Sequence, residues 1–138
     1  MRSPEELTES FRQQGLKVTP QRQAVFRAIH GDHSHPTAES VHKMVAADMP
    51  TVSLRTVYQT LNDLTDMGEI RSVDLGTGST RFDPNVESIH QHFVCTSCGQ
   101  IRDLAITVDT VRPKDLPAGF KADNTELLVR GKCDGCNH

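Results

Sequence analysis

Apolar residues recur every three or four positions through the first half of the chain, a spacing that predicts amphipathic helices. Four such stretches each begin at a Ser or Thr suited to cap a helix: Ser3, Thr19, Thr37 and Ser53. Gly15 and Gly68 are expected to end the first and fourth helices. The side chains expected to face a core are Leu7, Phe11, Ala24, Val25, Ala28, Ile29, Val41, Met44, Val45, Leu54, Val57, Leu61 and Leu64.

The fourth helix, predicted over residues 54–67, carries a second pattern on its other face. Arg55, Tyr58, Gln59 and Asn62 follow one another at spacings that place them together on that face. Long polar and aromatic side chains of this kind can read the edges of DNA bases. A simple solvated face is the other interpretation, and the pattern alone leaves both open.

Alternating polar and apolar residues replace the helical spacing after Gly68. Residues 69–75 and 80–83 read as two strands joined by the Gly-rich tip 76–79, which predicts a β-hairpin. Several short helices followed by a hairpin is the order of a winged helix-turn-helix, with the fourth helix in the major groove. The sequence therefore predicts a DNA-binding domain over residues 1–84.

The remainder, residues 85–138, is expected to be a smaller α/β domain, so that the whole chain is α+β. Strands are predicted at 90–95, 100–105 and 121–130, with a short helix over 107–116 that Pro113 and Pro117 restrict. So few apolar residues make a poor independent core, and such a domain needs a metal ion, a partner chain, or both.

Charge and composition narrow the partners only slightly. The 138 residues carry a net charge of −3, but the segment 12–27 holds Arg12, Lys17, Arg22 and Arg27 and no acidic residue, which leaves DNA open as a partner. No apolar run has the length of a membrane helix or signal peptide. We therefore expect no membrane partner and a cytoplasmic location, where thiols stay reduced.

Four cysteines form the strongest chemical signal in the sequence. They stand in two Cys-x-x-Cys pairs, Cys95 with Cys98 and Cys133 with Cys136. Reduced thiols in two such pairs predict a structural zinc site with four thiolate ligands. A thioredoxin-like redox motif would need only one pair beside a βαβ unit, which is not expected here.

A second group of candidate ligands contains imidazoles and carboxylates: His35, Asp83, His90, His92 and Asp103. Alternation along a strand places His90 and His92 on one face, where two imidazoles can share a metal ion. Singly, each of the five residues also has an ordinary interpretation as a solvated or turn residue. Residue chemistry alone leaves the full set open.

Several segments together resemble the ferric uptake regulator family. They are Gly15-Leu16-Lys17-Val18-Thr19-Pro20-Gln21-Arg22, His35-Pro36-Thr37-Ala38, Thr56-Val57-Tyr58, and His90-Gln91-His92 followed by Cys95-x-x-Cys98-Gly99. The resemblance spans nearly the whole chain, in order. It implies a dimeric, metal-dependent repressor with an N-terminal winged helix and a C-terminal dimerisation domain, and it places the structural zinc on the four cysteines.

The resemblance is strongest to the peroxide-sensing branch of that family. His35, Asp83, His90, His92 and Asp103 match its regulatory ligands, a set that suits iron(II) or manganese(II). It implies hydrogen peroxide as the signal and oxidation at His35 or His90. An iron- or manganese-level sensor without peroxide chemistry is the alternative. A zinc sensor would typically add a cysteine near the hinge, and the iron- and nickel-sensing branches a longer histidine cluster.

The polar face of the fourth helix and the acid-free basic segment predict the operator contacts. The expected DNA-binding residues are Lys17, Arg22, Arg55, Thr56, Tyr58 and Gln59. Gln59 departs from the family pattern, because many members have Arg at that position, so the base or phosphate contacts there are expected to differ.

Enzymes form the rival class. A zinc hydrolase or deaminase needs an open zinc position and a motif such as H-E-x-x-H, which does not occur, and a zinc held by four cysteines has no open position. A zinc-ribbon interaction module would not explain the capped helices upstream. We therefore predict a transcriptional repressor and not an enzyme.

Overall fold

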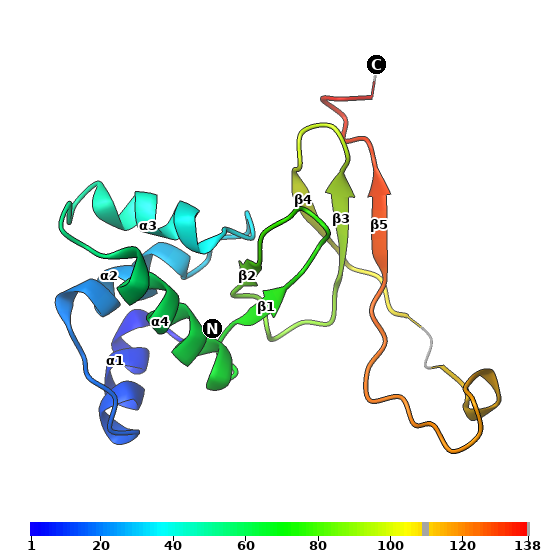
Figure 1. The fold of residues 1–138 in the computed structure, drawn as a ribbon, viewed down its shortest axis with the longest axis horizontal. Helices are drawn as coiled ribbons and strands as arrows, with labels where there is room; N and C mark the ends of the chain where they lie inside the picture. The colour runs from blue at the N-terminus through cyan, green and yellow to red at the C-terminus, as the bar shows by residue number, and fades with distance from the viewer. Residues whose placement is uncertain (109–110, 138) are drawn as a thin grey trace. The chain divides into compact units, whose positions relative to one another are not determined.

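The computed structural model describes residues 1–108 and 111–137, and the chain divides into two compact units, Met1–Ser88 and Ile89–His138. Each unit is described by itself. The first holds four helices and a hairpin, and the second holds a three-stranded sheet (Figure 1). This is the α+β class that the sequence predicts. None of the helices in the described residues is both long and apolar enough to cross a membrane.

The helices of the first unit are α1 (Pro4–Gln13), α2 (Pro20–Ile29), α3 (Ala38–Ala46) and α4 (Leu54–Asp66). Each begins at a predicted cap, because the side chains of Ser3, Thr19, Thr37 and Ser53 accept hydrogen bonds from backbone N–H groups of the first turn. Gly15 and Gly68 follow α1 and α4 with φ values of 73° and 75°, a conformation that favours glycine.

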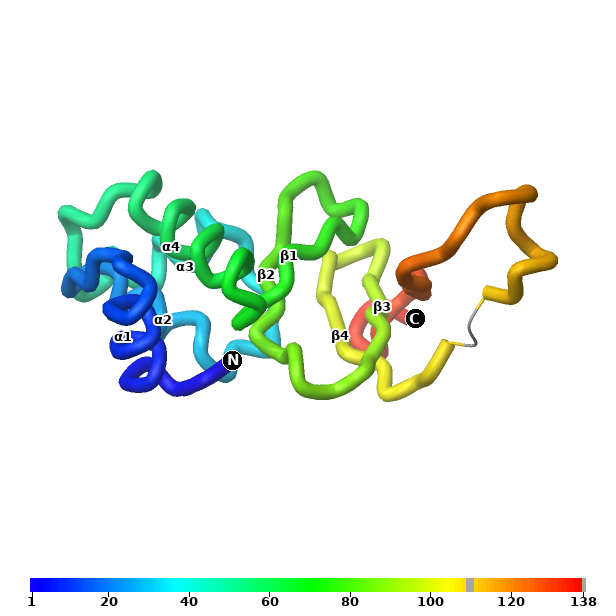
Figure 2. Tube along the Cα trace, turned by 90° about the horizontal axis from the view of Figure 1, so that it is seen from below, coloured from blue at the N-terminus to red at the C-terminus, as the bar shows by residue number. Residues whose placement is uncertain are grey.

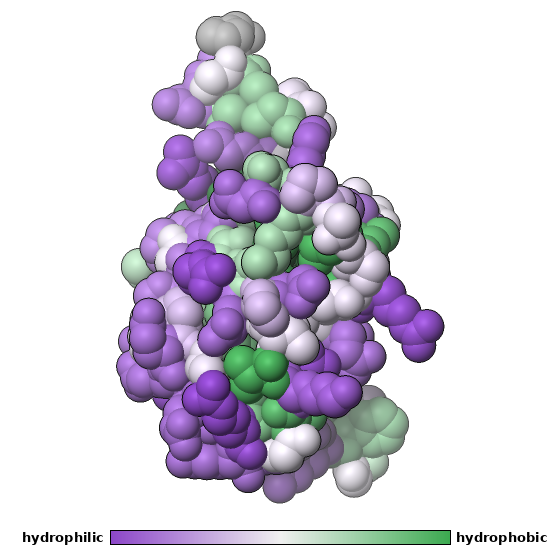
Figure 3. Space-filling view, turned by 90° about the vertical axis from the view of Figure 1, so that its left-hand side faces the viewer, coloured by the Kyte–Doolittle hydropathy of each residue, from purple (hydrophilic) through white to green (hydrophobic). Residues whose placement is uncertain are grey.

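A single hydrophobic core joins these four helices. Phe11 and Phe26 meet edge to face in it, with ring centroids 4.8 Å apart. The other large hydrophobic side chains that are fully buried are Leu7, Val25, Ile29, Val41, Val57, Leu61, Leu64 and Ile70. The face shown in Figure 3 is mostly hydrophilic, with small, separate hydrophobic patches.

Two residues expected in this core lie at the surface instead. Met44 is 41% exposed and Leu54 is 38% exposed. Leu54 is the first residue of α4, where no preceding turn covers it, and Met44 lies at the edge of the apolar stripe of α3. The predictions that they face inward were wrong, because helical periodicity does not show where neighbouring helices stop.

The hairpin consists of β1 (Arg71–Val73) and β2 (Arg81–Asp83), which pair antiparallel with Arg71 opposite Asp83. Its strands are shorter than the predicted 69–75 and 80–83. Phe82 is buried, and its N–H donates to the carbonyl of Pro36 at 2.9 Å. That bond ties the second strand to the segment just before α3.

In the second unit, β3 (Gln91–Cys95) is the central strand of a sheet ordered β4-β3-β5. The strand β4 (Ile101–Leu104) pairs antiparallel with it, and β5 (Leu128–Gly131) pairs parallel. A parallel pair needs a long crossover. Figure 2 shows the described parts of the connection that follows β4, residues 105–108 and 111–127, extending away from β3 and β4.

Two predictions for this connection were wrong. The strand expected over 121–130 is the short β5, and the helix expected over 107–116 is only a 3-10 turn, η1 (Pro113–Asp115), in the part that the structure describes. Residues 109 and 110 of that expected helix lie outside the described residues. Pro113 and Pro117 account for the difference, because proline interrupts helical hydrogen bonding.

Candidate metal and nucleic-acid sites

The four cysteines gather in one cluster of the second unit. Their sulfur atoms all lie within 4.8 Å of one another, and Cys98 Sγ is 3.7 Å from Cys133 Sγ. Zinc–thiolate bonds of about 2.3 Å in a tetrahedron separate two sulfurs by about 3.8 Å. All four cysteines are free thiols, so the donor set and its spacing fit a structural zinc ion.

The parallel strand pair is what brings the two Cys-x-x-Cys turns together. Cys95 stands opposite Gly131, and the N–H of Thr96 donates to the Gly131 carbonyl at 2.8 Å. Each turn is closed by a backbone bond, from Gly99 N–H to the Cys95 carbonyl and from Cys136 N–H to the Cys133 carbonyl, both at 3.0 Å. The ligands are therefore held by the backbone.

Backbone donors also prepare one sulfur for a cation. The N–H groups of Cys98 and Cys133 lower the pKa of Cys95 to about 5. Hydrogen bonds with the neighbouring thiols of Cys133, Cys98 and Cys95 raise the pKa of Cys136 to about 12. These two shifts favour a Cys95 thiolate beside a protonated Cys136 thiol when no cation is bound. Binding of a divalent cation favours loss of the Cys136 proton.

The second unit also holds two imidazoles beside a carboxylate. The register of β3 with β4 places His92 opposite Asp103. Asp103 Oδ1 lies 3.6 Å from His90 Nε2 and 3.7 Å from His92 Nε2, and the two imidazole rings are 4.9 Å apart. These contacts are longer than ideal hydrogen bonds. Two nitrogens facing one oxygen at such distances suit a shared cation.

In the first unit, His35 and Asp83 form a buried pair, with His35 Nε2 3.5 Å from Asp83 Oδ2. Both side chains are 1% exposed. His35 is the only described non-glycine residue with positive φ, at 55°. Arg81 donates to its carbonyl, and the Asn85 N–H donates to Asp83, so both partners are anchored by neighbours. Such strain at a buried polar residue is typical of functional sites.

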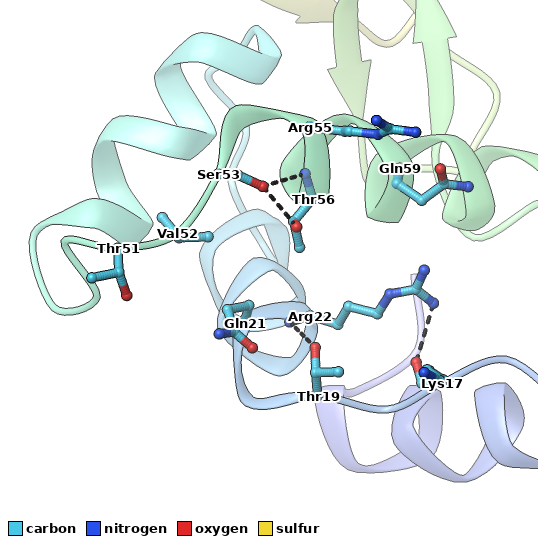
Figure 4. Close-up of a pocket in the computed structure, with 10 residues that line it drawn as sticks. All are labelled: Lys17, Thr19, Gln21, Arg22, Thr51, Val52, Ser53, Arg55, Thr56 and Gln59. Carbon is cyan, nitrogen blue, oxygen red and sulfur yellow. Dashed lines mark hydrogen bonds between the residues drawn. The ribbon is translucent and has the colours of Figure 1, made fainter.

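Five of the predicted DNA contacts line one hollow of about 380 Å³. They are Arg22 on α2, Lys17 in the loop before α2, and Arg55, Thr56 and Gln59 on α4. In Figure 4 the side chains of Arg55 and Gln59 extend the same way from α4, and Arg22 extends that way from α2. The caps Thr19 and Ser53, with Gln21 and Thr51, also line it and were missed. The capping role of Thr19 and Ser53 could have indicated this, because the N-termini of helices attract anions.

Arg22 differs from the other cations of the hollow because it is engaged within the protein. Its guanidinium lies 3.3 Å from Asp63 Oδ2, with both side chains 15% exposed. It also donates to the Lys17 carbonyl at 3.1 Å and lies 5.6 Å from the centroid of the Phe11 ring. Tyr58 does not line the hollow, and its hydroxyl donates to Glu39 on α3.

Comparison with known proteins shows the family to which this chain belongs. The family model described as the ferric uptake regulator family matches residues 13–129. The chain belongs to the ferric uptake regulator family. A curated Staphylococcus aureus relative, the peroxide-responsive repressor PerR, is 39% identical over 134 residues, covering 96% of this chain and 90% of that protein.

Solved structures of family members share the fold. The Helicobacter pylori ferric uptake regulator superposes with a TM-score of 0.75 at 21% identity, covering 97% of this chain and 91% of that one. PerR from Streptococcus pyogenes superposes with a TM-score of 0.56 at 23% identity, covering 99% and 94%. The predicted family and fold class are confirmed.

Membership of the ferric uptake regulator family also decides the class of activity. Its members are metal-dependent transcriptional regulators that bind DNA operators as dimers, so the prediction of a regulator and not an enzyme is confirmed. Two kinds of cofactor fit the donors: zinc for the four thiols, and iron or manganese for imidazole and carboxylate. The assignment of individual residues to metals and to DNA stays a prediction.

Proposed function

We propose that this chain is a peroxide-responsive, metal-dependent repressor that binds operator DNA as a homodimer in the cytoplasm. The observation that carries the proposal is the 39% identity, over nearly the whole chain, to the peroxide-responsive repressor of S. aureus. The location of the thiols supports it as well. All four cysteines gather in one cluster, which leaves the sensing chemistry to imidazole and carboxylate ligands.

The proposal assigns the regulatory metal to five residues, His35, Asp83, His90, His92 and Asp103, and the structural zinc to Cys95, Cys98, Cys133 and Cys136. Residues 1–84 would bind DNA and residues 85–138 would hold the zinc and the dimer contacts. Three nitrogens and two carboxylates suit iron(II) or manganese(II).

The histidines would carry the signal. Iron(II), if held by these five residues, would supply the electron that reduces peroxide, a reaction that manganese(II) does not readily undergo. The side chains of His35 and His90 are 1% and 4% exposed, so both rings are screened from bulk solvent. Oxidation of either ring would weaken a nitrogen ligand and release the operator. Zinc-bound thiolates would react poorly by comparison.

On the DNA side, α4 would enter the major groove, and Lys17, Arg55, Thr56, Tyr58 and Gln59 would contact bases or phosphates. Arg22 would act mainly by holding the segment of Lys17, since its guanidinium donates to that carbonyl. The polar hollow and the N-termini of α2 and α4 favour a phosphate there.

The decisive experiment uses an operator selected from random duplexes by the manganese-loaded protein. The iron form should bind the same operator, and brief peroxide should release it with a gain of one oxygen atom on the peptide carrying His35 or His90 and with zinc retained. The manganese form, exposed identically, is the control and should stay bound. Release through zinc loss and disulfides, with both histidines intact, would contradict the proposal and favour a metal-level sensor.

A further inference from the structure

The one tyrosine of the chain is held by a carboxylate from a neighbouring helix. Tyr58 lies on the exposed face of α4, with 38% of its surface accessible. Its hydroxyl donates to Glu39 Oε1 at 2.7 Å, and Glu39 belongs to the first turn of α3. The sequence pattern alone did not predict a role for Glu39.

This bond is charge-assisted, which makes it stronger than a bond between neutral groups. The Tyr58 hydroxyl lowers the pKa of Glu39, so the carboxylate stays ionised at neutral pH. Glu39 in turn raises the pKa of Tyr58, so the hydroxyl keeps the proton that it donates. Both effects favour the same bonded state.

The bond limits what Tyr58 can offer to DNA. A free tyrosine hydroxyl on a DNA-facing helix readily bonds to a phosphate, and phosphate contacts carry no sequence information. With its hydroxyl on Glu39, the side chain presents ring carbons instead. Apolar carbons in the major groove distinguish thymine through its methyl group.

The charge of Glu39 points to the same conclusion. A carboxylate beside a DNA-facing helix repels the phosphate backbone and weakens binding to every sequence. A residue that only strengthened DNA binding would have the opposite charge. Attraction to DNA therefore does not account for an acid at this place, whereas its bond to Tyr58 gives it a role there.

We infer that Glu39 is a positioning residue for DNA reading: it holds the Tyr58 hydroxyl so that the ring, and not the hydroxyl, meets a thymine methyl. The inference rests on the proposed DNA-binding role of α4. It makes Glu39 a determinant of specificity that lowers overall affinity.

The bond itself has a clean optical test, because the chain has one tyrosine and no tryptophan. Absorbance of tyrosinate followed against pH therefore reports Tyr58 alone. The pKa of Tyr58 should lie above the ordinary value of about 10 in the wild type. It should return to that value in Glu39→Ala. Asp48→Ala removes another exposed carboxylate, just beyond α3, and should leave the titration unchanged.

The DNA test replaces each thymine of the selected operator, one at a time, by deoxyuridine, which lacks only the methyl group. The wild type in its manganese form should lose about fourfold in affinity at one thymine of each half-site, the amount expected from one buried methyl. In Glu39→Ala and in Tyr58→Phe that loss should fall towards none. The double variant should be no worse than either single one.

A conservative variant separates position from charge. Glu39→Gln keeps an oxygen that accepts from Tyr58, so the loss at that thymine should persist while binding to all sequences tightens. Asp48→Ala should keep the wild-type loss. Helical circular dichroism should be unchanged in every variant.

Two failures are distinguishable. A wild type that selects no DNA sequence would overturn the proposed function, and this inference with it. A wild type that selects its operator, while Glu39→Ala keeps the full deoxyuridine loss or an unchanged tyrosine pKa, would overturn the inference alone.

Discussion

Cys95 and Gly131 stand opposite each other in the parallel pair of β3 and β5, and this register puts the first cysteine of the cluster beside the strand that leads to the last two. A Cβ built on Gly131 would lie 3.2 Å from Phe93 Cε2 and 3.3 Å from Phe93 Cζ. A methyl group at this point would fit only if the Phe93 ring moved by a few tenths of an ångström. The zinc site depends on how closely a phenyl ring and a backbone approach each other.

Gly131→Ala should lower the free energy of unfolding of the second unit by about 1–2 kcal/mol, because Phe93 must shift to admit the methyl group. Gly135→Ala is the matched control, since its added methyl would make only ordinary contact with Cys133 Sγ at 3.9 Å. Denaturant unfolding of the zinc-loaded proteins measures both. Equal stabilities of the two variants would show that Phe93 relaxes without cost.

Removal of zinc should unfold the second unit and dissociate the dimer. Structural zinc contributes roughly 10–16 kcal/mol in small domains, against a total stability of about 5–15 kcal/mol, so its loss outweighs the rest. Cys136→Ser should give a monomeric chain that keeps its helical signal but loses zinc. Ser97→Ala changes a Cys-x-x-Cys turn without removing a thiol, and sedimentation should find it dimeric. A stable zinc-free dimer of Cys136→Ser would contradict this prediction.

Arg22→Ala should destabilise the first unit by about 2 kcal/mol, because it leaves Asp63 partly buried without its partner. Arg27 is an exposed arginine of the same helix, and Arg27→Ala should have little effect. Removing Asp63 as well should restore part of the loss. Thermal unfolding distinguishes this role from a DNA contact, which would reduce operator affinity and leave the melting temperature unchanged.

Lys17→Ala should weaken binding about equally on all sequences and reduce the slope of log affinity against log salt by about one, as expected for one lost phosphate contact. The side chain is exposed beside the hollow, so stability should not change. Lys114→Ala, an exposed lysine in η1, serves as the control. Binding titrated across a range of salt concentrations decides it, and an unchanged slope would remove Lys17 from the interface.

Gln59→Arg should change the preferred base at one position of each half-site from adenine to guanine. A glutamine amide can pair with both the N6 and N7 groups of adenine, whereas arginine does so with O6 and N7 of guanine. Gln59 and Arg55 extend the same way, one helical turn apart (Figure 4). Selection from random duplexes with both proteins makes the comparison. Identical selected sequences would place Gln59 away from the bases.

Features that depend on residues close together in the chain could be predicted from the sequence. Ser3, Thr19, Thr37 and Ser53 cap helices because their hydroxyls reach N–H groups of the following turn, and that reach is a matter of spacing. The two Cys-x-x-Cys turns were recognisable for the same reason. Their meeting in one cluster was inferred from coordination number, and the structure bears it out.

Features that depend on contacts between distant segments could not be predicted from the sequence. The exposure of Met44 depends on where other helices end, and the short β5 on how much of its segment meets β3. The engagement of Arg22 depends on Asp63, far along the chain on another helix. Glu39 was missed likewise, because its partner Tyr58 is 19 residues away.

The parallel pairing of β3 with β5 also sets an order of events during synthesis. The four helices are built largely from local contacts, which form quickly, and they leave the ribosome first. Cys133 is 38 residues after Cys95, so the second Cys-x-x-Cys turn can pack against the first only after that segment has been synthesised. Until Cys136 has been added, the growing chain has a folded helical part but an incomplete zinc site. A product truncated before β5 would therefore expose the thiols of Cys95 and Cys98 and leave one edge of β3 without a paired strand.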